Sequence, residues 1–159
     1  MSIQVGEPIP SARLSLMSEH GPQVLNTQDY FAGRRVVLFA VPGAFTPTCS
    51  AYHLPGFIEH LNDFLDKGID AVACVAVNDV FVMHAWGKHE KAEGIDMLAD
   101  GNAQFTIALG LEKDGSAFGM GMRSSRFALV AEDGIVTHLM VEAAGEFRVS
   151  TAEAVLAVL

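Results

Sequence analysis

The chain has 159 residues, half of them apolar and 18% charged, which is enough for one domain, residues 1–159, around a sizeable core. Its formal net charge of −9 repels phosphate backbones, and since no basic stripe or RNA-binding motif occurs, we expect no nucleic-acid partner. No apolar run is long enough to cross a bilayer and the N-terminus lacks the apolar stretch of a signal peptide, so we expect a cytoplasmic protein with no membrane partner.

The first half of the chain predicts two buried strands with a helix between them. The run 35–41 is rich in β-branched residues and ends at a Pro-Gly pair, which is typical of a buried strand. Apolar residues then recur at helical spacing from Pro47 onward. They predict a helix that is kinked at Pro55 and ends at Gly68. The run 70–77 predicts the second buried strand.

The next segment predicts a longer helix, a strand and a short helix. The longer helix is expected to begin at a cap, either Asn78 or Asp79, and to end at Gly94. A short strand is expected at 95–100, and a short helix at 103–111.

The last third of the chain predicts a β-hairpin followed by a helix. Two apolar runs within 126–141 are joined at 132–134, whose sequence Glu-Asp-Gly is typical of a hairpin turn. The C-terminal segment predicts a helix with Ser150 or Thr151 as its cap. Glu153 would then stand in the position that completes a capping box.

Strands that alternate with helices and are followed by a hairpin and a terminal helix outline a thioredoxin-like α/β fold. We therefore expect a central mixed β-sheet flanked by helices. The pattern predicts this class of fold but not the order of the strands in the sheet.

The two cysteines, Cys49 and Cys74, do not form a disulfide framework and are expected to be free thiols. Cys49 follows the first buried strand, where open α/β sheets place their ligands. If Thr46 is the helix cap and Pro47 the first helical residue, the N–H groups and dipole of the first turn favour the Cys49 thiolate. The alternative is a buried, inert cysteine, which fits Cys74 better because apolar residues flank it on both sides.

The segment "PGAFTPTCS" resembles the active-site motif of the peroxiredoxins, with Pro42, Thr46 and Cys49 at the matching spacing. The segments "HLPGFIEHLNDFLDKGID" and "VNDVFVMHAWGK" are similar to the subgroup that contains mammalian peroxiredoxin V and the plant type II enzymes. The segment "RFALVAEDGIV" is similar to the one that carries the arginine of the family, here Arg126. The resemblance runs from about Gly6 to the C-terminus.

The resemblance implies a thiol-dependent peroxidase that reduces hydrogen peroxide and alkyl hydroperoxides. The Cys49 thiolate would attack the terminal peroxide oxygen, which leaves a sulfenic acid on the sulfur and releases water or an alcohol. Arg126 would stabilise the thiolate and the departing oxygen through its fork of donors. No metal, flavin or haem cofactor is implied.

The residues offer independent support for Arg126. If the strand after it runs antiparallel to the strand 35–41, Arg126 lies at the same sheet edge as Cys49. Arg123 is the rival, and the "GMGMRSS" segment around it is interpreted as a loop that positions Arg126.

The other residues of the motif are expected to support the reaction of Cys49. Thr46 would cap the helix or, by resemblance, direct its hydroxyl at the sulfur and the peroxide. Pro42 would shape the pocket, and the N–H groups near Gly43 and Cys49 would complete an anion site. Phe45, which we expect to be exposed like Phe118, would line the peroxide pocket or a dimer face.

The sequence departs from mammalian peroxiredoxin V where that enzyme has its resolving cysteine, because Val149 stands at the matching position. Plant type II enzymes have a cysteine at the position of Cys74, which makes Cys74 a candidate resolving residue. We expect Cys74 to lie too far from Cys49 for a disulfide. The hypothesis is a one-cysteine enzyme reset by an external thiol, glutathione with glutaredoxin or thioredoxin. By resemblance, the enzyme is a homodimer.

Two other classes of function are a metalloprotein and a redox sensor. The six histidines form no i, i+4 pair and join no cysteine pair or carboxylate cluster, so no metal site is expected. The main alternative is a thioredoxin-fold redox sensor or holdase whose cysteine is oxidised once and does not turn over.

Overall fold

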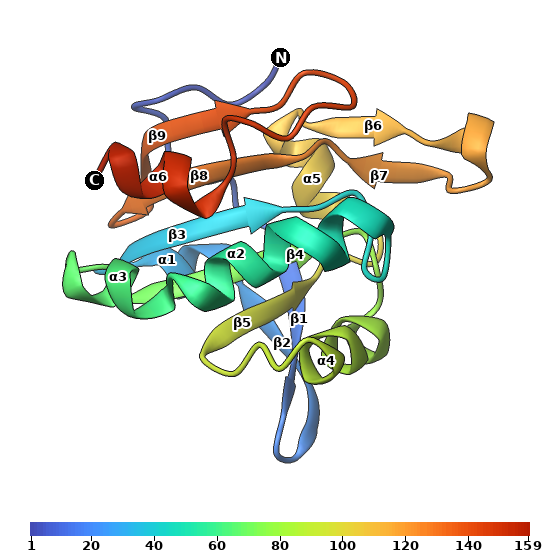
Figure 1. The fold of residues 1–159 in the computed structure, drawn as a ribbon, viewed down its shortest axis with the longest axis horizontal. Helices are drawn as coiled ribbons and strands as arrows, with labels where there is room; N and C mark the ends of the chain where they lie inside the picture. The colour runs from blue at the N-terminus through green and yellow to red at the C-terminus, as the bar shows by residue number, and fades with distance from the viewer.

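The computed structural model describes all residues from 1 to 159, and its centre is a seven-stranded mixed β-sheet (Figure 1). In spatial order the strands are β2 (Gly21–Asn26), β1 (Arg13–Ser18), β5 (Ile95–Ala99), β4 (Ala71–Ala76), β3 (Arg35–Ala40), β8 (Phe127–Glu132) and β9 (Ile135–Val141). The central strands β3, β4 and β5 are parallel, and the strands outside them are antiparallel to their neighbours. The predicted thioredoxin-like α/β fold is confirmed.

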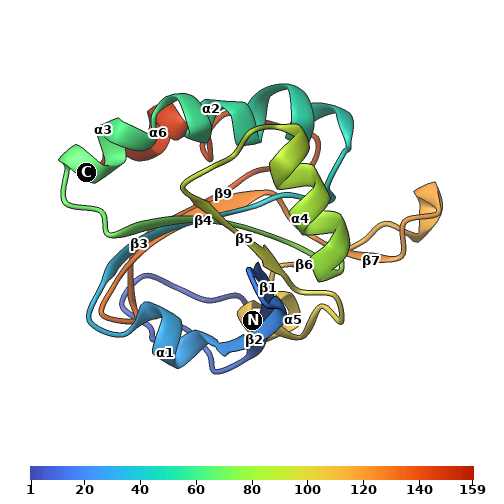
Figure 2. The ribbon, with the colours of Figure 1, turned by 90° about the horizontal axis from the view of Figure 1, so that it is seen from below.

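Six α-helices cover the two faces of this sheet (Figure 2). They are α1 (Thr27–Phe31), α2 (Leu54–Glu59), α3 (Leu61–Asp66), α4 (Val80–His89), α5 (Gln104–Leu109) and α6 (Ala152–Ala157). Helices α2, α3, α4 and α6 lie on one face, and α1 and α5 lie on the other. None of these helices is long and apolar enough to cross a membrane.

The core consists of two hydrophobic clusters, one on each face of the sheet. In β3, Val37 and Phe39 belong to the cluster under α2 and α4, whereas Leu38 belongs to the cluster near α1 and α5. Side chains of a strand alternate between faces, so a strand buried on both sides needs an uninterrupted apolar run. The same alternation in β4 directs Cys74 toward the face that also holds Cys49.

The segment after β3 differs from the single kinked helix that the sequence predicted. A π-helical turn spans Cys49–His53 and leads directly into α2. The predicted kink at Pro55 is wrong, because Pro55 lies in the first turn of α2, where a missing N–H costs little. The break comes instead at His60, between α2 and α3. The predicted end at Gly68 is confirmed by its φ of +86°.

Two predicted helix termini are partly corrected. Asp79 caps α4 by accepting from the Val82 N–H at 2.9 Å, but α4 ends at His89, before Gly94. Thr151 caps α6, since its hydroxyl accepts from the Ala154 N–H at 3.0 Å. Glu153 completes no capping box, and its carboxylate lies 3.1 Å from His60 Nε2 instead.

The remaining predicted elements β4, β5 and α5 and the hairpin β8–β9 are confirmed. The hairpin turns at Asp133 and Gly134, whose φ angles of +49° and +78° suit a two-residue turn. The sequence analysis missed the N-terminal hairpin β1–β2, helix α1 and a second, two-stranded sheet. That sheet pairs β6 (Glu112–Asp114) with β7 (Met122–Ser124) and extends beyond the main sheet (Figure 1).

Candidate active site

Cys49 begins the π-helical turn beyond the carboxyl end of β3, and its side chain is completely buried. The connection is a short loop in which Phe45 has a φ of +64°, a left-handed conformation that non-glycine residues rarely adopt. Ser50 N–H donates to the Thr46 carbonyl at 2.9 Å, which closes the first turn of the helix. The loop therefore turns the chain sharply enough to return the cysteine to the edge of the sheet.

Arg126 reaches the sulfur of Cys49. Its Nη2 donates to Cys49 Sγ at 3.1 Å, although the two residues are 77 positions apart in the chain. Strand β8 runs antiparallel to β3, and Phe127 pairs with Ala40 at the end of β3. The residue before β8 therefore lies beside the residues that follow β3, as the sequence predicted.

His53 is a second partner of Arg126, and the sequence analysis missed it. Arg126 Nη1 donates to His53 Nδ1 at 2.8 Å, and His53 Nε2 donates to the Ser150 carbonyl at 3.0 Å. Because a guanidinium only donates and a carbonyl only accepts, these partners require the neutral ring with its proton on Nε2. Burial, aided by the charge of Arg126, lowers the pKa of His53 to about 3. The signal that could have revealed it is the four-residue spacing from Cys49 on one helical turn.

A cavity of about 410 Å³ lies over this site. Its wall includes Pro42, Thr48 and Arg126, together with residues of β6 and of the loop 142–147 that follows β9. Within that loop, the Phe147 ring lies 5.0 Å from the His53 ring and 5.7 Å from the Arg126 guanidinium carbon. The cavity thus connects solvent with the guanidinium that contacts the sulfur.

The other residues of the motif make contacts that differ in part from the prediction. The Thr46 hydroxyl donates to the Gly43 carbonyl at 2.7 Å, and it forms no hydrogen bond with a first-turn N–H or with the sulfur. Its lone pairs stay available to accept from a ligand. Phe45 is half-exposed and packs near Trp86 and His89, apart from the residues that line the cavity.

Arg123, the alternative to Arg126, makes hydrogen bonds with backbone carbonyls. Its Nε donates to the Met120 carbonyl at 2.9 Å, and its Nη1 donates to the Val77 carbonyl at 3.1 Å. These bonds hold the β6–β7 ribbon against the end of β4. Part of the "GMGMRSS" segment, interpreted as a loop, forms β7.

Cys74 is also completely buried, in the middle of β4 between Phe39 of β3 and Met97 of β5. Burial raises the pKa of its thiol, and proximity to Cys49 adds to the effect. Both cysteines are free thiols in the structure, and no hydrogen bond reaches the Cys74 side chain. Cys74 therefore has the environment of an inert, protonated thiol.

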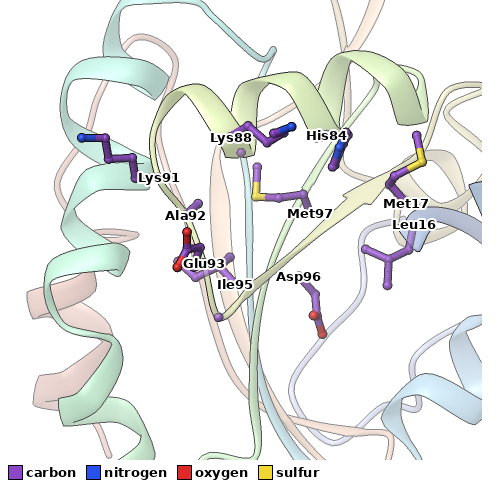
Figure 3. A pocket seen from close by; sticks show the side chains of 12 residues that line it. Leu16, Met17, His84, Lys88, Lys91, Ala92, Glu93, Ile95, Asp96 and Met97 are labelled. Carbon is purple, nitrogen blue, oxygen red and sulfur yellow. The ribbon is translucent and has the colours of Figure 1, made fainter. Parts of the chain in front are cut away.

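A second cavity, of about 390 Å³, lies between α4 and β5 (Figure 3). The sulfurs of Met17 and Met97 and the side chains of His84 and Lys88 lie along it, and no cysteine lines it. No group of three or more histidine, cysteine or acidic residues in the chain could hold a metal ion. This second cavity therefore offers neither a thiol nor a cluster of metal ligands.

Known proteins resemble this chain in sequence and in fold. The Redoxin family model matches residues 4–156. Peroxiredoxin-2B of Arabidopsis thaliana is 46% identical over 156 residues, which cover 97% of this chain and 96% of the plant protein. Reduced Prx3 of Vibrio vulnificus in complex with hydrogen peroxide is 52% identical, with a TM-score of 0.96 and 98% of each chain covered. Peroxiredoxin 5 of Alvinella pompejana is 35% identical, with a TM-score of 0.85 over 98% of this chain and 96% of that protein.

Proposed function

The chain belongs to the peroxiredoxins, in the subfamily of the plant type II enzymes and peroxiredoxin V, and on that premise we propose that Cys49 is its peroxidatic cysteine. A peroxiredoxin is a thiol-dependent hydroperoxide reductase, so the open question is which groups of this chain perform the reaction. The 3.1 Å contact from Arg126 Nη2 to Cys49 Sγ carries the proposal, because it places a cationic donor against only one of the two cysteine sulfurs.

In the proposed reaction, the Cys49 thiolate attacks the terminal oxygen of the hydroperoxide. An S–O bond forms, the O–O bond breaks, and the proton of the attacked oxygen leaves with the released water or alcohol. The sulfenate that remains takes a proton from solvent and becomes a sulfenic acid. The sulfur is oxidised by two electrons and the peroxide is reduced by two, so no cofactor takes part.

Arg126 is proposed to stabilise charge in both states of this step. Its guanidinium faces the thiolate before attack, and its remaining donors are directed toward the peroxide oxygens in the transition state. His53 binds the other arm of the guanidinium at 2.8 Å, which limits its rotation away from the sulfur.

The remaining motif residues are proposed to bind the peroxide. Thr46 offers an acceptor that its bond to Gly43 holds in place, and the Gly43 N–H donates to no group of the protein. Pro42 lines the cavity and is proposed to shield the sulfur from water. The relative from Vibrio vulnificus, whose crystal holds hydrogen peroxide, supports a hydroperoxide as the substrate.

Peroxide consumption with dithiothreitol tests the site assignment. We expect Cys49→Ser to abolish turnover and Cys74→Ser, the matched control, to retain most of it. Equal activity of wild type and Cys49→Ser would reject the assignment. Oxidation of Cys49 once, without further consumption of peroxide, would instead indicate a redox sensor or holdase.

The proposed catalytic cycle uses one cysteine. Val149 stands where mammalian peroxiredoxin V has its resolving cysteine, and Cys74 is a buried thiol in the middle of a strand. An external thiol, either glutathione with glutaredoxin or thioredoxin, is proposed to attack the sulfenic acid and to release the reduced enzyme as water leaves.

Counting free thiols by mass spectrometry after one equivalent of peroxide tests the one-cysteine cycle. We expect Cys74 to remain a free thiol while Cys49 is oxidised. An internal disulfide between the two cysteines would contradict the one-cysteine cycle and make Cys74 the resolving residue.

We also propose an assembly and a compartment for the protein. Phe45 is 49% exposed and Phe118 is 82% exposed, which favours a homodimer that covers them. Sedimentation equilibrium of wild type and Phe118→Glu tests this, since a monomeric wild type would contradict it.

Free thiols suit the reducing cytoplasm, which cell fractionation tests. A single cooperative unfolding transition would agree with one domain, residues 1–159.

A further inference from the structure

Hydrogen bonds continue outward from the sulfur for three more residues. Cys49 Sγ accepts from Arg126, Arg126 donates to His53, and His53 donates to the carbonyl of Ser150. His53 and Ser150 are completely buried. The orientation of the guanidinium therefore depends on a carbonyl in the loop that follows β9.

Glu142 holds that part of the loop. Its Oε2 accepts from the Ser150 hydroxyl at 2.6 Å, from the Ser150 N–H at 2.8 Å and from the Arg148 N–H at 2.8 Å. Only 9% of the residue is exposed, and its other oxygen, Oε1, is buried with no hydrogen-bond partner. The three bonds to Oε2 fix the position of Ser150 relative to the end of β9.

The electrostatics of the loop agree with an ionised Glu142. Burial alone would raise the pKa of Glu142, but the Ser150 hydroxyl and the N–H groups of Arg148 and Ser150 outweigh it, and the net pKa is lowered. The carboxylate therefore keeps its charge and its three donors at neutral pH. Its negative charge also acts on His53, where it partly offsets the cation of Arg126.

We propose that Glu142 is a positioning residue for the peroxidase reaction, acting through Ser150 and His53 on Arg126. By fixing the Ser150 carbonyl it selects the His53 tautomer whose Nδ1 accepts, and this holds Arg126 with Nη2 toward Cys49 Sγ. Glu142 itself touches neither the sulfur nor the guanidinium. The proposal rests on the proposed function, because it assumes that Cys49 is the reacting sulfur.

A purely structural role is the alternative. Glu142 would then only close the loop 142–150 and place Phe147 over the site. The two roles differ in one readout, since loop closure changes the melting temperature, whereas positioning also changes the rate at which Cys49 reacts and its dependence on pH. The pH dependence of the rate can reveal positioning, because two other buried groups do not titrate near neutral pH. The pKa of His53 is about 3, and burial raises the pKa of Cys74.

The experiment measures the rate of oxidation of reduced protein by excess hydrogen peroxide against pH, together with the melting temperature. The variants are Glu142→Ala, Glu142→Gln and Ser150→Ala. Glu132→Ala is the matched control, because Glu132 is an exposed glutamate at the end of β8 that lies away from Arg126. Wild type and Cys49→Ser are measured alongside.

For Glu142→Ala we expect the rate at pH 7 to be about tenfold lower, as for loss of a charge-assisted hydrogen-bond network. The midpoint of the rise in rate with pH should move to a higher pH. Glu142→Gln should recover most of the rate, since its amide oxygen accepts the same donors. Ser150→Ala loses one of the three bonds and should fall about twofold to threefold, which keeps the test open if Glu142→Ala does not fold. Glu132→Ala should match wild type.

Two results would overturn the positioning role. One is a folded Glu142→Ala or Ser150→Ala with the rate and pH profile of wild type, whatever its melting temperature. The other is Glu142→Gln as slow as Glu142→Ala. Failure of the proposed function is seen separately, since Cys49→Ser would then react like wild type.

Discussion

Cys49 and Cys74 are both completely buried and belong to the same hydrophobic cluster. Arg126 donates to the sulfur of Cys49 at 3.1 Å, whereas Cys74 has only apolar neighbours within the sheet, Phe39 and Met97. Burial raises the pKa of the Cys74 thiol. Burial alone therefore does not decide whether a thiol is inert, because a cationic donor in contact with the sulfur changes its environment.

The position in the chain explains the difference. Cys49 lies beyond the end of β3, where a loop and a helical turn leave room for side chains from other segments. Cys74 lies in the middle of β4, between two paired strands that fill the space around it. The end of a parallel strand is thus open to function, and its middle is not.

Removal of the cation should break the contrast between the two cysteines most strongly. We expect Arg126→Lys to lower the rate of Cys49 oxidation by about a hundredfold, since lysine offers no planar fork to hold both the sulfur and the peroxide. Stopped-flow oxidation by hydrogen peroxide measures it. Arg148→Lys is the control, because the Arg148 side chain is exposed. Equal rates for Arg126→Lys and wild type would contradict the role of Arg126.

Acid should destabilise the fold through His53, the buried neighbour of Arg126. The pKa of His53 falls from 6.5 to about 3 on folding, so the unfolded chain binds more protons between these values. Its contribution to stability is complete above pH 6.5 and is lost as the pH falls toward 3.

Denaturant unfolding at pH 7 and pH 5 measures this effect. Between pH 7 and pH 5 we expect the free energy of unfolding of His53→Gln to fall by roughly 1–2 kcal/mol less than that of wild type, because the amide imitates the neutral ring. His20→Gln is the control, since His20 is exposed. The same loss in wild type and His53→Gln would show that His53 does not carry the acid sensitivity.

Truncation at Cys74 should have the smallest effect and should sharpen the contrast. Cys74→Ala leaves a small void in the apolar core, so we expect the free energy of unfolding to fall by about 1 kcal/mol. Peroxide turnover should remain near that of wild type. A large loss of turnover in a folded Cys74→Ala would mean that Cys74 takes part in the reaction.

The contact between Arg126 and Cys49 was predictable because it follows from backbone pairing. The turn at 132–134 joins two apolar runs and thereby predicts the hairpin β8–β9. The assumption that its first strand is antiparallel to β3 then places Arg126 beside Cys49, and the structure confirms that pairing.

His53 and Glu142 were not predictable in the same way. Their contacts with each other's surroundings arise because the loop after β9 folds back over the π-helical turn, and no pattern in the sequence predicts the path of that loop. The break at His60 was missed for a similar reason, since contacts of His60 with Asp63 and Glu153 accompany it and a tertiary contact has no local signal. The ribbon β6–β7 consists of two three-residue strands, which are too short to show a hydrophobic period.

The most direct measurement is a chemical trap for the first oxidation product. Reduced protein receives one equivalent of hydrogen peroxide in the presence of a 1,3-diketone, which reacts with sulfenic acids, and the modified residue is located by peptide mass spectrometry. We expect the adduct on Cys49 and an unmodified thiol at Cys74. An adduct on Cys74 with Cys49 unmodified would contradict the assignment of Cys49 as the peroxidatic sulfur.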